Sequence, residues 1–163
     1  MKKIRENSFI SEACNERFLH VDAHFRAKSS LTHHDIYKAG MSTIYPRYEM
    51  SRPRPCFHLL ILTSAGRGRL EAPETEFDVP PGTGLLIPSR NAHRYTVNRS
   101  PWCITWFHMK ESDRWRFLEG RNISLFECSY LDDVNSVASA LHNECRRMSS
   151  QSAKVVSSLS DVI

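Results

Sequence analysis

The chain has 163 residues and a formal net charge of +4, with 40% hydrophobic and 25% charged residues. These values are typical of one soluble globular domain and exclude a wholly disordered chain. No apolar run approaches the roughly 20 residues of a membrane-spanning helix, and no apolar stretch follows the basic N-terminus as a signal peptide requires. The basic residues are spread along the chain, so charge alone does not indicate a nucleic-acid partner.

The five cysteines are scattered along the sequence and odd in number. None forms a C-x-x-C pair, so the sequence favours neither a zinc ribbon nor a disulfide framework. Cysteines that pack as small apolar side chains are typical of a reducing compartment. We therefore expect a cytoplasmic protein with no membrane partner.

Residues 1–42 show no regular period, and we expect them to form an N-terminal arm. Between residues 43 and 112, short β-rich runs alternate with turn residues. The clearest run, 57–63, is apolar with β-branched members and predicts a buried strand. Segments rich in glycine and proline at 64–68 and 80–83 predict tight turns. Closely spaced strands with such turns are typical of an antiparallel β-sandwich or barrel.

A helical pattern follows over residues 113–163, and we expect this region to mediate dimerisation. Apolar residues recur there at spacings of three and four, as on one face of an amphipathic helix. This stripe consists of Leu131, Val134, Val137, Ala138, Leu141, Cys145 and Met148. It is more apolar than packing on a small barrel requires, which favours a homodimer. A second stripe from Val155 ends with the chain at Ile163, so we expect a longer protein with a further domain.

The stretch from residue 52 to 109 resembles the N-terminal domain of AraC-type transcription regulators, a member of the wider cupin group. The motifs that carry the resemblance are Arg52-Pro53 and the segments 57–68, 77–88, 92–95 and 101–108. The resemblance implies a mainly β fold, a cupin-like (jelly-roll) antiparallel barrel with a C-terminal helical dimerisation hairpin. It also implies that a small effector, often a sugar, binds in the barrel beneath an N-terminal arm. DNA would be bound only through a C-terminal domain that lies outside this chain.

The resemblance also implies an effector site with five residues. Trp106 occupies the position of the aromatic residue that stacks on a sugar ring, Tyr95 matches an effector-contacting tyrosine, and Arg52 matches an arginine that binds polar groups. Ile104 stands where the arabinose-type sensor has a histidine, so a less polar ligand such as a deoxy or modified sugar is expected. His93 is expected to be a hydrogen-bonding residue of the barrel.

Strand alternation predicts that Trp102, Ile104, Trp106 and His108 share one face of a strand. If Trp106 faces the cavity, the other three are expected to face it as well. For Trp102 and Trp106, plain packing in the core is the alternative interpretation.

A metal centre is not expected. His93 falls at the histidine of the second cupin motif, but the chain contains no H-x-H pair, and Ile61 occupies the place of the metal-binding carboxylate. One remaining histidine cannot hold a catalytic metal. We therefore predict no metal and no cofactor.

No catalytic motif is recognisable either, because the chain has no G-x-S-x-G, no P-loop and no dinucleotide-binding glycine fingerprint. The leading interpretation is a ligand-sensing and dimerisation domain that is not an enzyme. One alternative is a small metal-dependent cupin enzyme, such as a sugar isomerase or dioxygenase. Another is a barrel with an occluded cavity that serves only for dimerisation.

Overall fold

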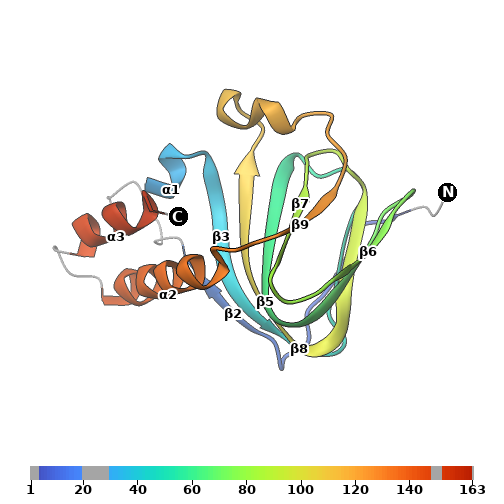
Figure 1. Cartoon of the computed structure of the whole chain (residues 1–163), viewed down its shortest axis with the longest axis horizontal. Coiled ribbons are helices and arrows are strands. Elements are labelled where there is room, and N and C mark those ends of the chain that lie inside the picture. The colour runs from blue at the N-terminus through green and yellow to red at the C-terminus, as the bar shows by residue number, and fades with distance from the viewer. Residues whose placement is uncertain (1–3, 20–29, 148–151, 163) are drawn as a thin grey trace.

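The computed structural model describes residues 4–19, 30–147 and 152–162. Its centre is a pair of long antiparallel strands, β5 (Phe57–Glu71) and β8 (His93–Lys110), which pair along most of their length. One end of this pair is extended by β3 (Ile36–Ile44), β2 (Asn15–Phe18), β7 (Thr83–Ile87) and β9 (Ser124–Glu127). The other end is extended by β4 (Glu49–Arg52), β1 (Asn7–Phe9) and β6 (Glu76–Val79). Figure 1 shows that these strands curl into an antiparallel barrel, as the sequence predicted.

The turn expected at 64–68 is instead a bend within β5. The pairing register of β5 with β8 shifts three times between Thr63 and Gly68, so bulges turn the strand without ending it. Gly66 lies at the bend with φ of 70°, and a Cβ there would overlap the Pro101 carbonyl. The strands therefore continue through the bend, and β8 runs unbroken from His93 to Lys110.

Side chains alternate between two cores along the central strands. Leu59, Ile61 and Trp102 are buried inside the barrel. Leu62 and Phe107 point the other way, into a second core on the outer face of the sheet. The helices cover this outer face at one side of the barrel (Figure 1).

The helices are α1 (Ser30–His33), a 3₁₀ helix η1 (Asp113–Leu118), α2 (Leu131–Arg147) and α3 (Ser152–Ser160). The apolar stripe of α2 packs on the outer face of the barrel. Leu131, Ala138 and Leu141 are buried there, while Val134 and Cys145 are partly buried against the same core. The stripe therefore has a partner within the chain, contrary to the reasoning that it exceeds what the barrel needs. Met148 lies outside the described residues.

Two expected boundaries differ from the observed elements. The barrel begins before residue 43, because β3 starts at Ile36 and pairs with β8. The region after residue 112 is not wholly helical, because Ser124–Glu127 forms β9 at the edge of β7. No described helix is long and apolar enough to cross a membrane.

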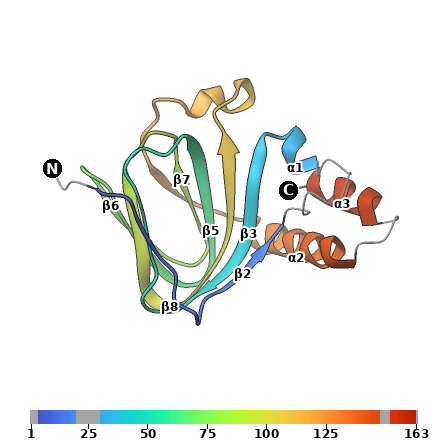
Figure 2. The same ribbon diagram turned by 180° about the vertical axis from the view of Figure 1, so that it is seen from behind.

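The first described residues form an arm across the barrel (Figure 2). Its strand β1 pairs with β4, and its strand β2 pairs with β3. The arm thus connects the two ends of the β5–β8 pair.

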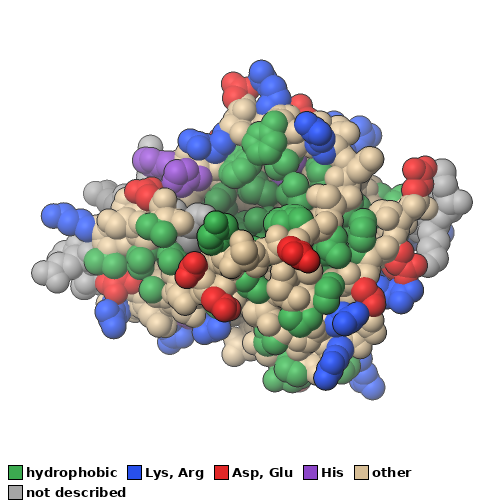
Figure 3. Space-filling model, in the orientation of Figure 1, with side chains coloured by type: hydrophobic (Ala, Val, Ile, Leu, Met, Phe, Trp, Pro, Cys, Tyr) green, Lys and Arg blue, Asp and Glu red, His purple; other side chains and the backbone are tan. Residues whose placement is uncertain are grey.

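Apolar side chains are also exposed on the face shown in Figure 3, interspersed with acidic ones. The large exposed side chains include Phe117 of η1 (61% exposed) and Phe126 of β9 (43% exposed). Single exposed apolar side chains of this kind are ordinary on a globular protein.

Candidate functional site

A small cavity of about 80 Å³ lies inside the barrel beneath the arm, and both the barrel and the arm line it. Four of the five expected effector residues are on its wall: Arg52, Tyr95, Ile104 and Trp106. The other lining residues are Ile10, Glu16, Lys38, Tyr48, Met50 and His108. Residues that are far apart in the sequence therefore line one cavity in the fold.

Trp106 is both a wall residue and part of the inner core, with 8% of its surface exposed. Its indole Nε1 donates a hydrogen bond of 2.8 Å to the Ser42 hydroxyl, which lies 3.5 Å from a carboxylate oxygen of Glu16. The ring lies across the backbone of Gly40 on β3, where any Cβ would overlap it. These contacts hold the indole in one place, as a stacking surface requires.

Trp102 shares the inner face of β8 but does not line the cavity. It is fully buried, its Nε1 donates to Thr63 Oγ1 at 3.2 Å, and its ring covers Gly68. The expectation that all four residues of the face reach the cavity was therefore wrong for Trp102. It is a core residue at the bend, whereas Ile104, Trp106 and His108 lie further along the strand.

Two cations face the cavity. The Arg52 guanidinium carbon lies 5.4 Å from the centre of the Phe57 ring. The Lys38 ammonium lies 5.8 Å from the Trp106 ring centre and 5.2 Å from that of Phe18. Both arrangements are typical of cation–π contacts, which hold a charge close to an aromatic wall.

His108 stacks on Phe57 with 4.3 Å between ring centres and a 12° angle between the planes. Its Nδ1 lies 3.4 Å from the Tyr37 hydroxyl. Burial, with the charges of Arg52 and Lys38, lowers the pKa of His108 to about 3. The ring is thus neutral at neutral pH and adds no positive charge to the cavity.

His93 is not on the cavity wall but stacks on Tyr95, with 6.0 Å between ring centres. Its Nδ1 lies 2.9 Å from the Asn91 carbonyl, while its buried Nε2 has no partner among the described residues. Burial lowers the pKa of His93 to about 4. His93 therefore supports Tyr95 as a neutral ring, and any effect on a ligand passes through that phenol.

Tyr95 and Tyr48 form a pair at the wall, with 6.1 Å between ring centres. Burial raises the pKa of both phenols. Both therefore remain protonated at neutral pH and offer hydroxyl groups that donate or accept hydrogen bonds.

Among the described residues, no three His, Cys, Asp or Glu side chains are grouped as metal ligands. The cavity holds one carboxylate, Glu16, and one imidazole, His108. The absence of a metal remains a prediction, since no measurement of metal content tests it.

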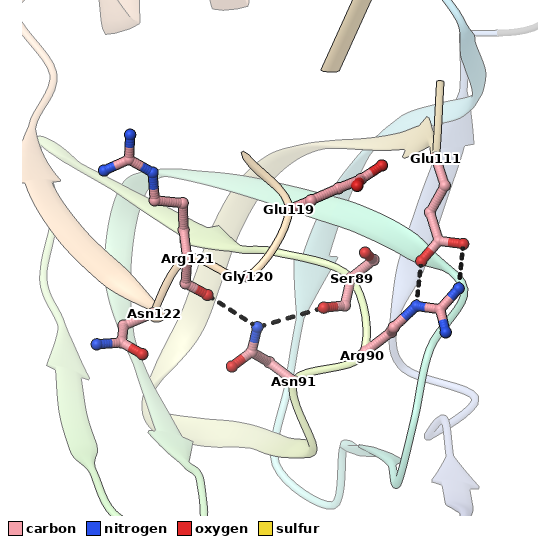
Figure 4. Close-up of a pocket in the computed structure, with 8 residues that line it drawn as sticks. All are labelled: Ser89, Arg90, Asn91, Glu111, Glu119, Gly120, Arg121 and Asn122. Carbon is pink, nitrogen blue, oxygen red and sulfur yellow. Dashed lines mark hydrogen bonds and ion pairs between the residues drawn. The ribbon is translucent and has the colours of Figure 1, made fainter. Parts of the chain in front are cut away.

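A second hollow lies on the surface, between the loop after β7 and the segment after η1 (Figure 4). Its polar groups are used to hold these loops together. The Arg90 guanidinium donates two hydrogen bonds to Glu111, at 2.8 and 3.0 Å, and Asn91 Nδ2 donates to the carbonyls of Arg121 and Ser89. Because Arg90, Glu111 and Asn91 are used to hold these loops together and the hollow is open to solvent, we favour the cavity inside the barrel as the ligand site.

Comparison with known proteins decides the family. Residues 36–162 match the family model described as the AraC-like ligand binding domain. The chain belongs to this family. The resemblance predicted from the sequence motifs is confirmed, and the matched region begins with β3.

Individual relatives agree with this assignment. Over 74 residues the AraC-like domain is 39% identical to the MmsAB operon regulatory protein of Pseudomonas aeruginosa, covering 42% of this chain but only 24% of that protein. The AraC-like transcriptional activator CuxR matches with a TM-score of 0.54 and 15% identity, covering 79% of this chain and 51% of CuxR. Protein Ylba from E. coli matches with a TM-score of 0.52 and 11% identity, covering 78% and 48%. At these identities the structural matches show the fold alone.

Five cavity residues could not be found from the sequence motifs: Ile10, Glu16, Lys38, Tyr48 and Met50. Glu16 and Lys38 lie before the first matched motif, and they reach the cavity only because β2 pairs with β3 and β3 pairs with β8. The register places Lys38 opposite His108. Strand alternation from Trp106 indicated His108 correctly, but no local pattern indicates its cross-strand neighbour.

Proposed function

We propose that this AraC-like domain is the sensing and dimerisation part of a bacterial transcription regulator, not an enzyme. A small polar metabolite, a sugar or a related compound, binds in the cavity and controls DNA binding by a separate domain. The observation that carries this proposal is the meeting of Trp106, Tyr95 and Arg52 at one cavity under the arm. An indole face with a few polar groups is suited to a small ligand that has both apolar and polar parts.

The contacts of the arm support a coupling between the cavity and the helices. The Phe18 ring packs edge-on against Trp106, with 5.9 Å between ring centres. The Phe18 carbonyl lies 3.0 Å from Nδ1 of His142 on α2. A ligand that moves the indole therefore acts on the arm and, through it, on α2. Such differential packing is what an effector needs in order to shift a regulator between two states.

The direct test is calorimetric titration of a panel of sugars and related small metabolites against the wild-type chain and Trp106→Ala. We expect the substitution to weaken binding of the effector by ten- to a hundredfold, equivalent to about 1–3 kcal/mol, because the stacking face is lost. Calorimetry is preferable to fluorescence here because Trp106 is itself a fluorophore.

Trp115→Phe is the matched control. Trp115 lies on η1, and its Nε1 donates to the His34 carbonyl at 2.9 Å, away from the cavity. We expect this variant to bind the effector as the wild type does. Unchanged binding by Trp106→Ala, or unfolding of that variant by circular dichroism, would show that Trp106 is only a core residue.

A further inference from the structure

The cavity wall has unbalanced positive charge. It contains two cations, Lys38 and Arg52, and a single carboxylate, Glu16. The lowered pKa of His108 and the raised pKa values of Tyr48 and Tyr95 keep these three groups neutral at neutral pH. An anionic ligand would balance this charge, whereas a neutral ligand would leave it in place.

Of these two cations, Arg52 is the one with a buried hydrogen-bond donor that lacks an acceptor. Its Nε is buried and has no hydrogen-bond partner, and none of the ion pairs among the described residues includes Arg52. Arg94 also has a buried Nε without a partner, but its two terminal nitrogens form ion pairs with Glu49 and Glu71, at 3.0 and 3.6 Å. Arg67 lies 3.2 Å from an Asp78 oxygen. A buried guanidinium donor without an acceptor is unfavourable, so the site is stabilised when an acceptor arrives.

The acceptor that matches a guanidinium best is a carboxylate, because its two oxygens accept two parallel N–H donors. A phosphate dianion fits less well. It brings two negative charges to a wall whose two cations, Arg52 and Lys38, are already partly balanced by the Glu16 carboxylate, whereas a carboxylate ligand brings one.

The size and lining of the cavity limit the rest of the ligand. Its volume of about 80 Å³ is well below the roughly 300 Å³ at which pockets for larger ligands begin. Ile10, Met50 and Ile104 contribute apolar wall beside the Trp106 ring. The hydroxyl of Ser42, a polar group close to the indole, is already hydrogen-bonded to Trp106 Nε1. A polyhydroxylated ring therefore has little space in this cavity.

We propose that the effector of this AraC-like domain is a small monocarboxylate, whose carboxylate pairs with Arg52 close to Lys38 and whose short apolar body packs on Trp106 and Ile104. This inference rests on the proposed effector site and narrows the effector from a polar metabolite to a short-chain acid.

The test is calorimetric titration of the whole chain with acetate, propionate and butyrate. Propionamide and butyramide serve as uncharged analogues of the same shape, and arabinose and inorganic phosphate represent the other ligand classes. We expect at least one acid to bind at millimolar or lower concentration. We expect its amide to bind at least about tenfold more weakly, because the charge-assisted pair with Arg52 is lost.

Three variants make the result specific. Arg52→Gln should abolish the preference for the acid over its amide, while Arg52→Lys should retain part of it. Arg67→Gln removes the same charge from the outside of the barrel and should bind like the wild type. Thermal denaturation of each variant verifies that it is folded, and Arg52→Lys keeps the test valid if Arg52→Gln does not fold.

The outcomes separate the two proposals. Binding of arabinose or of an amide that depends on Trp106 but not on Arg52 would support the effector site and overturn the carboxylate. Phosphate binding in preference to the acids would also overturn it, as would the failure of every acid to bind. Acid binding that survives both Arg52→Gln and Trp106→Ala would place the ligand elsewhere and contradict the proposed site itself.

Discussion

At the scale of single residues, two buried histidines, His108 on the cavity wall and His93 behind Tyr95, affect the stability of the fold. Burial lowers the pKa of His93 to about 4 and, together with nearby positive charge, that of His108 to about 3. Both rings are neutral in the folded protein near pH 5, whereas in the unfolded chain they become protonated as the pH falls below roughly 6.5. The unfolded state thus binds more protons over this range, and the free energy of unfolding must fall as the solution becomes more acidic.

We predict that the free energy of unfolding decreases between pH 6.5 and pH 5, and that His93→Gln makes this decrease shallower. Removing one such histidine should reduce the slope by up to about 1.4 kcal/mol per pH unit. Urea denaturation at several pH values measures the slope, and His33→Gln, at an exposed histidine, is the control. An identical slope in His93→Gln would mean that His93 is protonated equally in the folded and unfolded chains.

Single residues also show which parts of the candidate site can be predicted from the sequence. Trp106 and Tyr95 were located through a family resemblance and alternation, both of which depend on residues close in sequence. Lys38 and Glu16 were missed because their place in the cavity depends on the pairing register of three strands. Register is fixed by packing across the whole sheet, so no local pattern encodes it.

At the scale of elements, the sequence indicated β-structure correctly but divided it wrongly. Glycine and proline suggested chain reversals, yet β5 passes through its bend at Gly66 with bulged pairing to β8. The four residues Ser124–Glu127 were assigned to a helical region. So short a segment carries too little periodicity to show its type, and its pairing with β7 decides it.

The arm is the element with the least support. Strand β2 is a short edge strand whose side chains are mostly exposed, and it pairs with β3 alone. Segments of this kind open locally at a low cost in free energy. Its contacts beyond β3 include the Phe18 carbonyl with His142 and the Leu19 carbonyl with Cys145 Sγ, at 3.0 and 3.9 Å.

We predict that His142→Ala accelerates amide hydrogen exchange in β2 by up to roughly tenfold. The substitution removes one hydrogen bond, and such a bond contributes about 0.5–1.5 kcal/mol. Mass spectrometry of exchanged peptides measures the change. Strand β1 is the internal control, because it pairs with β4 and should exchange as in the wild type. Equal rates in β2 of both proteins would show that α2 does not hold the arm.

At the scale of the whole molecule, the apolar stripe of α2 and the outer face of the barrel cover each other. The stripe residues Leu131 and Leu141 are buried between α2 and the sheet. An interface between two copies must therefore use what this packing leaves exposed. Val155 on α3 is 43% exposed, and Val162, which follows the end of α3, is 69% exposed. This surface lies at the opposite side of the barrel from β6 (Figure 1).

We predict that the domain is a homodimer through α2 and α3 at tens of micromolar, and that Val155→Glu shifts it toward monomer without unfolding it. A charge at an apolar contact is costly to bury, while an exposed valine contributes little to the fold. By contrast, Leu141→Ala should destabilise each protomer by about 2–5 kcal/mol, because it empties a buried site. Phe117→Glu, at a large exposed apolar side chain on η1, should leave the oligomeric state unchanged. Sedimentation equilibrium distinguishes these cases. A wild-type monomer at these concentrations would count against dimerisation, and dissociation by Phe117→Glu instead of Val155→Glu would move the interface from the helices to η1.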